Sequence, residues 1–169
     1  FKANILPYQM GNPHPRFWAW YMGNGTVIGA LADFLAAVMN PNLGGGNHVA
    51  NHVEAQVVSW LRDMVGFPDG TSGLLTSGGS MANFIALAVA RNARGGDDIH
   101  HRGVRAASGP LVSYASREVH SCMKKAVETL GLGSEGLQLI AVNADYTMDV
   151  DALRQRIAAD REAGKVPFC

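Results

Sequence analysis

The second half of the chain alternates between two hydrophobic periods, and this alternation restricts the fold more than any other feature. Three short apolar runs typical of strands lie at residues 74–76, 111–116 and 137–142. A segment with helical spacing of its apolar residues follows each run, at 80–94, 119–130 and 150–163. Strands that alternate with helices predict an α/β fold with a parallel sheet, right-handed crossovers, and ligands at the carboxyl ends of the strands.

Details within this half refine the prediction. Residues 95–109 are predicted to form a polar loop, and Asp149 is predicted to cap the helix at 150–163. A new apolar run begins at "VPFC", residues 166–169, directly after that helix. We therefore assign residues 71–169 to the first part of an α/β domain.

Residues 1–70 follow a different pattern and are assigned to a segment of loops and helices. The stretch 7–25 is rich in proline and glycine, which excludes a long regular element. Its large aromatic rings are too many to leave in solvent, so we expect this loop to pack against another part of the protein; they are Phe17, Trp18, Trp20 and Tyr21.

Two helices are predicted in the same segment. Thr26 is expected to cap an apolar helix that runs to about Asn40, and we interpret this helix as buried. A flexible glycine-rich connection at 41–48 leads to a second helix, which is expected to begin with Asn51 as its cap and to end at Gly66.

Composition excludes several classes of partner. The 14 basic and 14 acidic side chains are scattered, so no charged surface for a nucleic acid or an anionic membrane is indicated. The most apolar stretch, 26–39, contains Asp33 and is shorter than the roughly 20 residues of a membrane span. Cys122 and Cys169 lie far apart and no signal peptide is visible, which favours the reducing cytoplasm.

The segment Ser77-Gly78-Gly79-Ser80 lies between a predicted strand and a predicted helix. The backbone N–H groups at a helix N-terminus bind anions, and glycines allow the anion to approach the backbone closely. A phosphate site is one interpretation of the segment. The other is a tight turn in which Ser80 caps its own helix, and the spacing alone leaves both open.

His120 follows the strand at 111–116, at the same edge of the predicted sheet. It is expected either to converge with residues 78–80 on one crevice or to cap its own helix. Two further patterns are weaker. His48 and His52 lack the spacing of a zinc motif, so we expect no metal site. For Ser121 and Lys124, which form S-x-x-K, we favour a surface lysine on a helix over a nucleophile pair.

Four segments, in this order and spacing, resemble the pyridoxal-phosphate-dependent group II amino-acid decarboxylases, the family of aromatic-L-amino-acid, tyrosine, histidine and glutamate decarboxylases. They are "HPRFWAWY" (14–21), "HVEAQVVSWLRDMVGFP" (52–68), "GLLTSGGSMANFIALAVARN" (73–92) and "YASREVHSCMKKAVETLG" (114–131). The resemblance implies the fold-type I, aminotransferase-like large domain, incomplete in this chain. It also implies an obligate homodimer, with residues 1–70 lining the substrate side and the dimer interface.

The resemblance also implies roles for single residues. Gly78, Gly79 and Ser80 stand where the family holds the phosphate of pyridoxal 5'-phosphate. His120 stands where a catalytic histidine stacks on the pyridine ring and contacts the region of the substrate carboxylate. Met81 stands where some relatives have an acidic residue, a departure that concerns the helix rather than the phosphate contacts.

On the substrate side, Trp20, Tyr21 and Gly23 stand on the loop that shapes the side-chain pocket in the family. The implied function is decarboxylation of an L-amino acid, preferably an aromatic one, to the amine and CO2. The family's cofactor-bearing lysine, the aspartate that pairs with the pyridine nitrogen and the loop tyrosine are expected beyond Cys169. We therefore expect this chain alone to be inactive, with the remainder supplied by a longer chain or by a complementing C-terminal polypeptide.

Two alternatives remain at this stage. One is a noncatalytic α/β module that binds a phosphate-bearing metabolite or serves in assembly. The other is a different fold-type I enzyme, against which the loop "HPRFWAWY" argues because it belongs to the decarboxylases.

Overall fold

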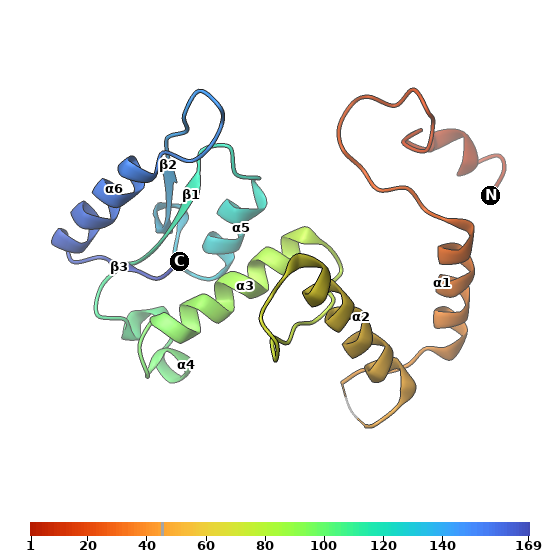
Figure 1. Cartoon of the computed structure of the whole chain (residues 1–169), viewed down its shortest axis with the longest axis horizontal. Helices are drawn as coiled ribbons and strands as arrows, with labels where there is room; N and C mark the ends of the chain where they lie inside the picture. The colour runs from red at the N-terminus through yellow and green to blue at the C-terminus, as the bar shows by residue number, and fades with distance from the viewer. Residues whose placement is uncertain (45) are drawn as a thin grey trace. The chain divides into compact units, whose positions relative to one another are not determined.

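The computed structural model describes residues 1–44 and 46–169 (Figure 1). Gly45, within the connection predicted at 41–48, lies outside the described residues. The chain divides into two compact units, Phe1–Asp69 and Gly70–Cys169, and each is described here by itself.

The first unit contains a 3-10 turn and two helices: Leu6–Tyr8, α1 (Val27–Met39) and α2 (Val49–Val65). The predicted cap of α1 is confirmed, because Thr26 Oγ1 accepts a hydrogen bond from the Gly29 N–H at 3.0 Å. The helix ends at Asn40, which adopts the left-handed conformation with φ 41°.

The predicted start of α2 is wrong by about one turn. The helix begins after His48, and Asn51 already lies inside its first turn. The Asn51 side-chain amide donates to the Gly46 carbonyl oxygen at 2.8 Å, so it stabilises the preceding connection instead of capping the helix. The predicted end is confirmed, since Gly66 adopts the left-handed conformation with φ 72°.

The prediction that α1 is buried is also wrong in the described chain. No residue of α1 or α2 is buried, and apolar side chains such as Ile28 are 80% exposed. The aromatic loop differs from expectation in the same way, with Trp18 90% and Tyr21 100% exposed. The reason is that every buried apolar residue of the described chain belongs to Gly70–Cys169, so this first unit has no core of its own to cover these surfaces.

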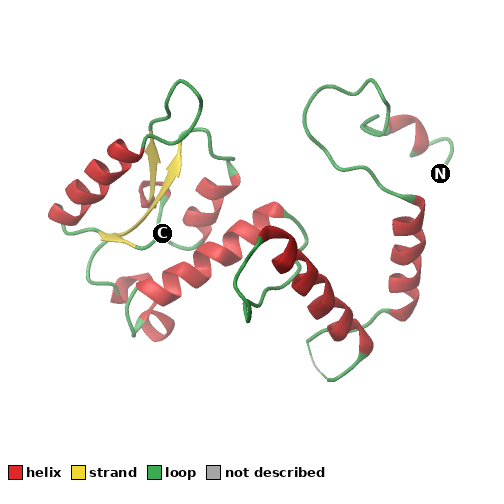
Figure 2. Ribbon diagram, in the orientation of Figure 1, coloured by secondary structure: helices red, strands yellow, loops and turns green. Residues whose placement is uncertain are grey.

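The second unit is built on a parallel sheet, as predicted, with the strand order β2-β1-β3. The strands are β1 (Leu111–Ser116), β2 (Leu137–Ile140) and β3 (Val166–Pro167). The pairing of β1 with β3 continues past Pro167, because the Tyr114 N–H donates to the Cys169 carbonyl oxygen at 2.9 Å. Helices α5 and α6 lie on opposite sides of the sheet (Figure 2).

The helices of this unit are α3 (Gly79–Arg94), α4 (Ile99–Arg102), α5 (Cys122–Thr129) and α6 (Val150–Glu162). The cap predicted for α6 is confirmed, because Asp149 Oδ1 accepts from the N–H groups of Asp151 and Ala152 at 3.0 and 2.9 Å. Helix α5 begins three residues later than predicted. Ser116 Oγ accepts from the Glu118 N–H at 3.1 Å, which holds the start of the segment after β1 in a turn.

Three other predictions for this unit need correction. Residues 74–76 belong to no strand in the part of the chain that the structure describes, and the sheet consists of β2, β1 and β3. The predicted loop at 95–109 contains α4 and a 3-10 turn at Gly103–Ala106, since Ile99 is drawn into the core and orders the segment around it. The strand predicted at 137–142 ends at Ile140, and Val142 instead forms an isolated antiparallel bridge with Met148.

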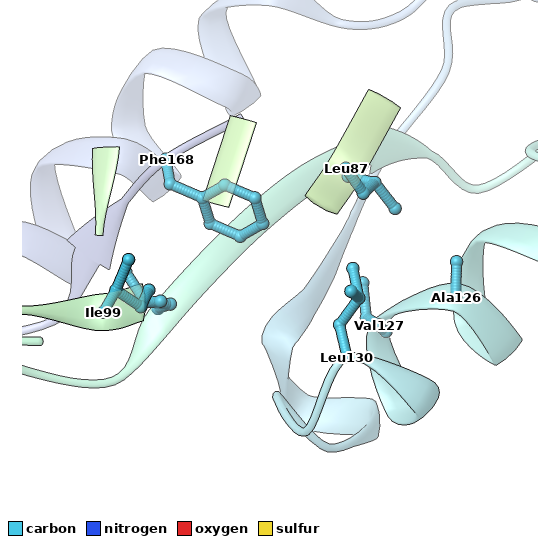
Figure 3. Close-up of a cluster of buried hydrophobic side chains, with 7 residues drawn as sticks. Leu87, Ile99, Ala126, Val127, Leu130 and Phe168 are labelled. Carbon is cyan, nitrogen blue, oxygen red and sulfur yellow. The ribbon is translucent and has the colours of Figure 1, made fainter. Parts of the chain in front are cut away.

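The core of the second unit lies between the sheet and the helices α3, α4 and α5 (Figure 3). It is formed by Leu87, Ile99, Leu111, Ala126, Val127, Leu130 and Phe168. Burial of these side chains provides the main favourable term in the folding of the unit. The same core holds α3 against α5. This packing sets the positions of residues 77–80, at the start of α3, and of His120, just before α5.

Candidate functional site

The segment Ser77-Gly78-Gly79-Ser80 leads into α3, which begins at Gly79. Gly78 is the N-cap and no side chain caps the helix, so the interpretation of Ser80 as its cap is wrong. The Met81 and Ala82 N–H groups both donate hydrogen bonds to the Gly78 carbonyl oxygen, at 3.1 and 3.0 Å. Among the described residues, the N–H groups of Gly79 and Ser80 have no acceptor, so they are available to an anion.

The space around this helix terminus suits a ligand that contacts the backbone. A Cβ atom placed on Gly78 or Gly79 would meet no protein atom within 4 Å, so the backbone is open on that side. Ser80 also lines a hollow of about 260 Å³ between α3 and α5. The other residues that line the hollow are Met81, Phe84, Cys122, Lys125, Ala126 and Thr129.

His120 lies in the turn between β1 and α5, and its side chain is exposed. The Cys122 N–H, the first of α5, donates to His120 Nδ1 at 3.2 Å. The interpretation of His120 as a residue that caps its own helix is therefore confirmed. Within the described residues Nε2 has no partner, so the capping bond leaves this nitrogen available to a ligand.

The two segments lie on helices that pack against each other. The side-chain amide of Asn83, three residues after Ser80, donates to Cys122 Sγ at 3.3 Å. His120 lines a second hollow of about 340 Å³ together with Arg117, Val119, Ser121, Lys124, Ser134, Leu137 and Leu139. Ser80 and His120 thus line two different hollows, and a crevice lined by both stays a prediction.

Sequence reasoning missed Asn83 and Cys122. The signal was present in part, because Asn83 lies one helical turn after Ser80, and residues three apart share a helix face. Cys122, two residues after His120, carried no comparable signal, since the sequence does not show which residue its thiol contacts.

Two groups with shifted pKa values, Asp160 and Tyr114, lie on the side of the sheet that α6 covers. Asp160 of α6 is buried, with Lys165 Nζ at 2.8 Å, Arg156 Nε at 3.0 Å and Tyr114 Oη at 3.1 Å. Burial alone would raise the pKa of Asp160, but the hydrogen bonds from Lys165, Arg156 and Tyr114 outweigh it and hold that pKa below its usual value. Burial and the bond to Asp160 raise the pKa of Tyr114 to about 12.

The candidate substrate residues belong to the first unit. Trp20 packs edge-to-face on Phe17 with ring centroids 5.5 Å apart, and Tyr21 is fully exposed. Gly23 follows in the same loop, where a Cβ atom would meet nothing within 4 Å. The role of Trp20, Tyr21 and Gly23 in substrate binding stays a prediction.

The weaker patterns found in the sequence have ordinary structural explanations. His48 Nε2 bonds to the Asn42 carbonyl oxygen at 2.7 Å, and His52 Nε2 bonds to Asn47 Oδ1 at 2.6 Å. Lys124 is exposed and lies 4.0 Å from Glu128 on the surface of α5. Over residues 1–44 and 46–169, no group of three His, Cys, Asp or Glu side chains could hold a metal ion, and no helix is long and apolar enough to cross a membrane.

The fold and these segments define an α/β unit with a parallel sheet, a helix α3 whose N-terminus is open to an anion, and an exposed histidine in the turn between β1 and α5. The sequence model of the pyridoxal-dependent decarboxylase conserved domain matches residues 2–169. The chain therefore belongs to the pyridoxal-dependent decarboxylase family, and the resemblance noted from the sequence is confirmed.

Two relatives illustrate the similarity. The chain is 37% identical to the aromatic-L-amino-acid decarboxylase of Bacillus atrophaeus, over 92% of this chain and 31% of the relative. It is 32% identical to tyrosine decarboxylase 2 of Narcissus pseudonarcissus, over 99% of this chain and 34% of the relative. The chain thus spans about a third of the length of these relatives.

A solved structure supports the fold. The glutamate decarboxylase domain of the diaminobutyrate-pyruvate transaminase and L-2,4-diaminobutyrate decarboxylase from Vibrio parahaemolyticus superposes with a TM-score of 0.74 at 28% identity. The match covers 82% of this chain and 32% of that chain. The fold-type I expectation is confirmed, and this chain holds one part of that architecture.

Proposed function

We propose that this chain supplies the phosphate-binding and ring-contacting part of a pyridoxal-phosphate-dependent decarboxylase, which converts an L-amino acid to its amine and CO2. The observation that carries the proposal is the open N-terminus of α3, where the N–H groups of Gly79 and Ser80 have no acceptor among the described residues. Membership of the pyridoxal-dependent decarboxylase family supports the same assignment.

The residues present fit the phosphate of this cofactor. Gly78 and Gly79 leave the backbone open, and the N-terminal end of α3 carries a partial positive charge that favours an anion. The Ser80 hydroxyl adds a donor that can rotate toward a phosphate oxygen. When bound, pyridoxal phosphate supplies the electron sink for the electron pair left at Cα as CO2 departs.

His120 is proposed to contact the ring of the cofactor and the carboxylate region of the substrate. Its imidazole is exposed beside α5 and is held at Nδ1 by the Cys122 N–H, so its position is restricted before any ligand binds. A side chain restricted in this way loses less conformational entropy on binding. In this proposal His120 orients the substrate carboxylate, which lowers the entropic part of the barrier.

The substrate is proposed to be an aromatic L-amino acid. Trp20 and Tyr21 expose large rings on which an aromatic side chain can stack, and Gly23 leaves room in the same loop. The two relatives named above, both described as decarboxylases of aromatic amino acids, support this choice. Release of CO2 from a panel of amino acids by the complete protein tests it, and activity restricted to glutamate or diaminobutyrate would contradict it.

The complete protein is proposed to work in the cytoplasm as a homodimer, or with a complementing C-terminal polypeptide. Support for an assembly comes from α1, whose exposed apolar side chains need a cover that the first unit does not provide. Cys122 and Cys169 are free thiols, which suits a reducing compartment. The chain alone is proposed to be inactive, because the lysine that carries the cofactor is expected in the remainder.

The phosphate assignment is tested by Ser80→Ala in the complete protein, with the exposed loop residue Ser108→Ala as the matched control. Loss of one hydrogen bond to a charged group corresponds to about tenfold weaker cofactor binding. The measurements are the cofactor retained after dialysis, read by visible absorption, and the rate of CO2 release. Equal retention by both variants contradicts the assignment, and protein that stays colourless with added pyridoxal phosphate favours a noncatalytic module.

A further inference from the structure

We infer that Asn83 is a positioning residue, which acts through Cys122 to hold the neutral His120 imidazole in the tautomer with its proton on Nε2. The inference deepens the proposed function, on which it rests for the role of His120 at a cofactor site. It concerns only residues of this chain and can be tested without the cofactor.

The first step is the hydrogen bond between the Cys122 N–H and His120 Nδ1, with 3.2 Å between the two nitrogens. A backbone amide nitrogen can only donate, so Nδ1 must accept with its lone pair. The neutral ring then carries its proton on Nε2. A proton on Nδ1 would place two donors face to face at the positive end of α5, which the helix dipole further disfavours.

This hydrogen bond also gives the first N–H group of α5 an acceptor. The first N–H groups of a helix have no partner within the helix, and Ser121, the N-cap of α5, makes no side-chain capping bond. The His120 ring takes that place by accepting from the first N–H of the helix. Rotation of the ring away from this position would therefore leave the N–H without an acceptor.

The second step is the contact between Asn83 and Cys122, which holds the Cys122 side chain in place. Its thiol is buried, and Sγ accepts from the Asn83 side-chain amide at 3.3 Å. Asn83 belongs to α3, three residues after Ser80. Further along α5, Ala126 and Val127 are buried in the core that also contains Leu87 of α3. The two helix N-termini are therefore tied by a polar contact at their ends and by apolar packing behind it.

The consequence is that His120 presents one defined hydrogen-bond donor to a ligand. With Nδ1 occupied, the exposed Nε2–H is the polar group that His120 presents to a ligand, and it suits an acceptor such as a carboxylate oxygen. Because Asn83 is part of the helix that carries Ser80, the phosphate side of the proposed site and the histidine side are held in a defined relation. Loss of the Asn83 amide should loosen that relation without removing any group that touches a ligand.

The test uses the full chain without cofactor, labelled with 15N and studied by NMR at alkaline pH. A coupling through the hydrogen bond is expected between the Cys122 amide nitrogen and His120 Nδ1, together with a proton on Nε2. A proton on Nδ1, or the absence of this coupling, overturns the inference. Since no cofactor is present, this result is independent of whether the complete protein binds pyridoxal phosphate.

The role of Asn83 is tested with Asn83→Ala and with Asn83→Asp, which keeps the shape but lacks the donor. Each is expected to accelerate hydrogen exchange of the Cys122 amide by about fivefold. Cys122→Ser keeps an acceptor for Asn83 and is expected to exchange as the wild type does. Asn92→Ala, at the other end of α3, is the matched control. Exchange rates equal to the control in both Asn83 variants overturn the role of Asn83, and the wild-type coupling still decides the first step if a variant does not fold.

Discussion

Replacement of Asp160 is expected to destabilise the unit Gly70–Cys169 more than replacement of any other acidic group on α6. Its side chain is 4% exposed and makes two ion pairs, with Lys165 and Arg156, in addition to the bond from Tyr114. Removal of one partner from a buried ion pair costs about 3–5 kcal/mol. Arg156 and Lys165 are 44% and 29% exposed and can regain water, so we expect the lower end, about 3 kcal/mol, for Asp160→Ala.

Asp160→Asn keeps the shape and the hydrogen-bond acceptor but removes the charge. Two charged hydrogen bonds become weaker by about 1 kcal/mol each, so a loss of about 2 kcal/mol is expected. The control is Asp151→Asn on the same helix, since the Asp151 ion pair with Arg154 at 2.8 Å is 82% and 74% exposed and contributes about 0–1 kcal/mol.

Urea unfolding followed by far-ultraviolet circular dichroism gives these free energies of unfolding. Tryptophan fluorescence would not serve, because Trp18, Trp20 and Trp60 all lie in Phe1–Asp69. The folded pKa of Asp160 is lowered, so its stabilising effect is fully present above the unfolded value of about 3.9 and is lost as the pH falls through the folded pKa. A loss for Asp160→Asn no larger than for the control, or one that does not shrink as the pH falls below the unfolded value of about 3.9, would refute the reasoning.

Two further predictions concern the same unit. Because the pKa of Tyr114 is raised to about 12, the stability it contributes is fully present below pH of about 10 and is lost as the pH rises through 12. Ultraviolet titration should show a late phenolate step that Tyr114→Phe removes, and a titration curve identical in the variant would count against it. Gly109→Ala is expected to cost about 1–3 kcal/mol, because its Cβ would lie 2.1 Å from a backbone carbonyl oxygen of the loop after α6. Gly79→Ala, whose Cβ meets no atom within 4 Å, should leave the thermal midpoint unchanged, and equal midpoints for the two variants would be evidence against the clash.

Local features of the fold could be predicted from the sequence because their causes are local. Thr26 and Asp149 cap their helices through N–H groups two or three residues away. Gly66 ends α2 because glycine adopts the left-handed conformation without steric cost. The bounds of β1 were also predicted, since its apolar run is buried on both faces of the sheet.

Features that depend on distant partners could not be predicted in the same way. Residues 74–76 have the composition of a strand, but membership of a sheet is decided by residues far away in the sequence, and the sheet of the described chain is formed by β2, β1 and β3. The apolar composition of α1 is visible in the sequence, whereas its burial depends on what covers it. At the candidate site, the spacing of Ser77-Gly78-Gly79-Ser80 singled out the segment but left its role open, and the resemblance supplied the phosphate prediction. The contact between Asn83 and Cys122 was missed, because it joins residues 39 positions apart.

The strand order β2-β1-β3 has a consequence for synthesis on the ribosome. β1 emerges first, yet it is the middle strand, so both of its edges are unpaired until later segments leave the exit tunnel. β2 then pairs with one edge of β1. The other edge stays unpaired until residues 166–169 have been synthesised, and these include Phe168, the last residue of the core. An unpaired strand edge invites pairing with other chains. One edge of β1 therefore stays open to aggregation throughout the translation of α6, even after β2 has covered the other edge.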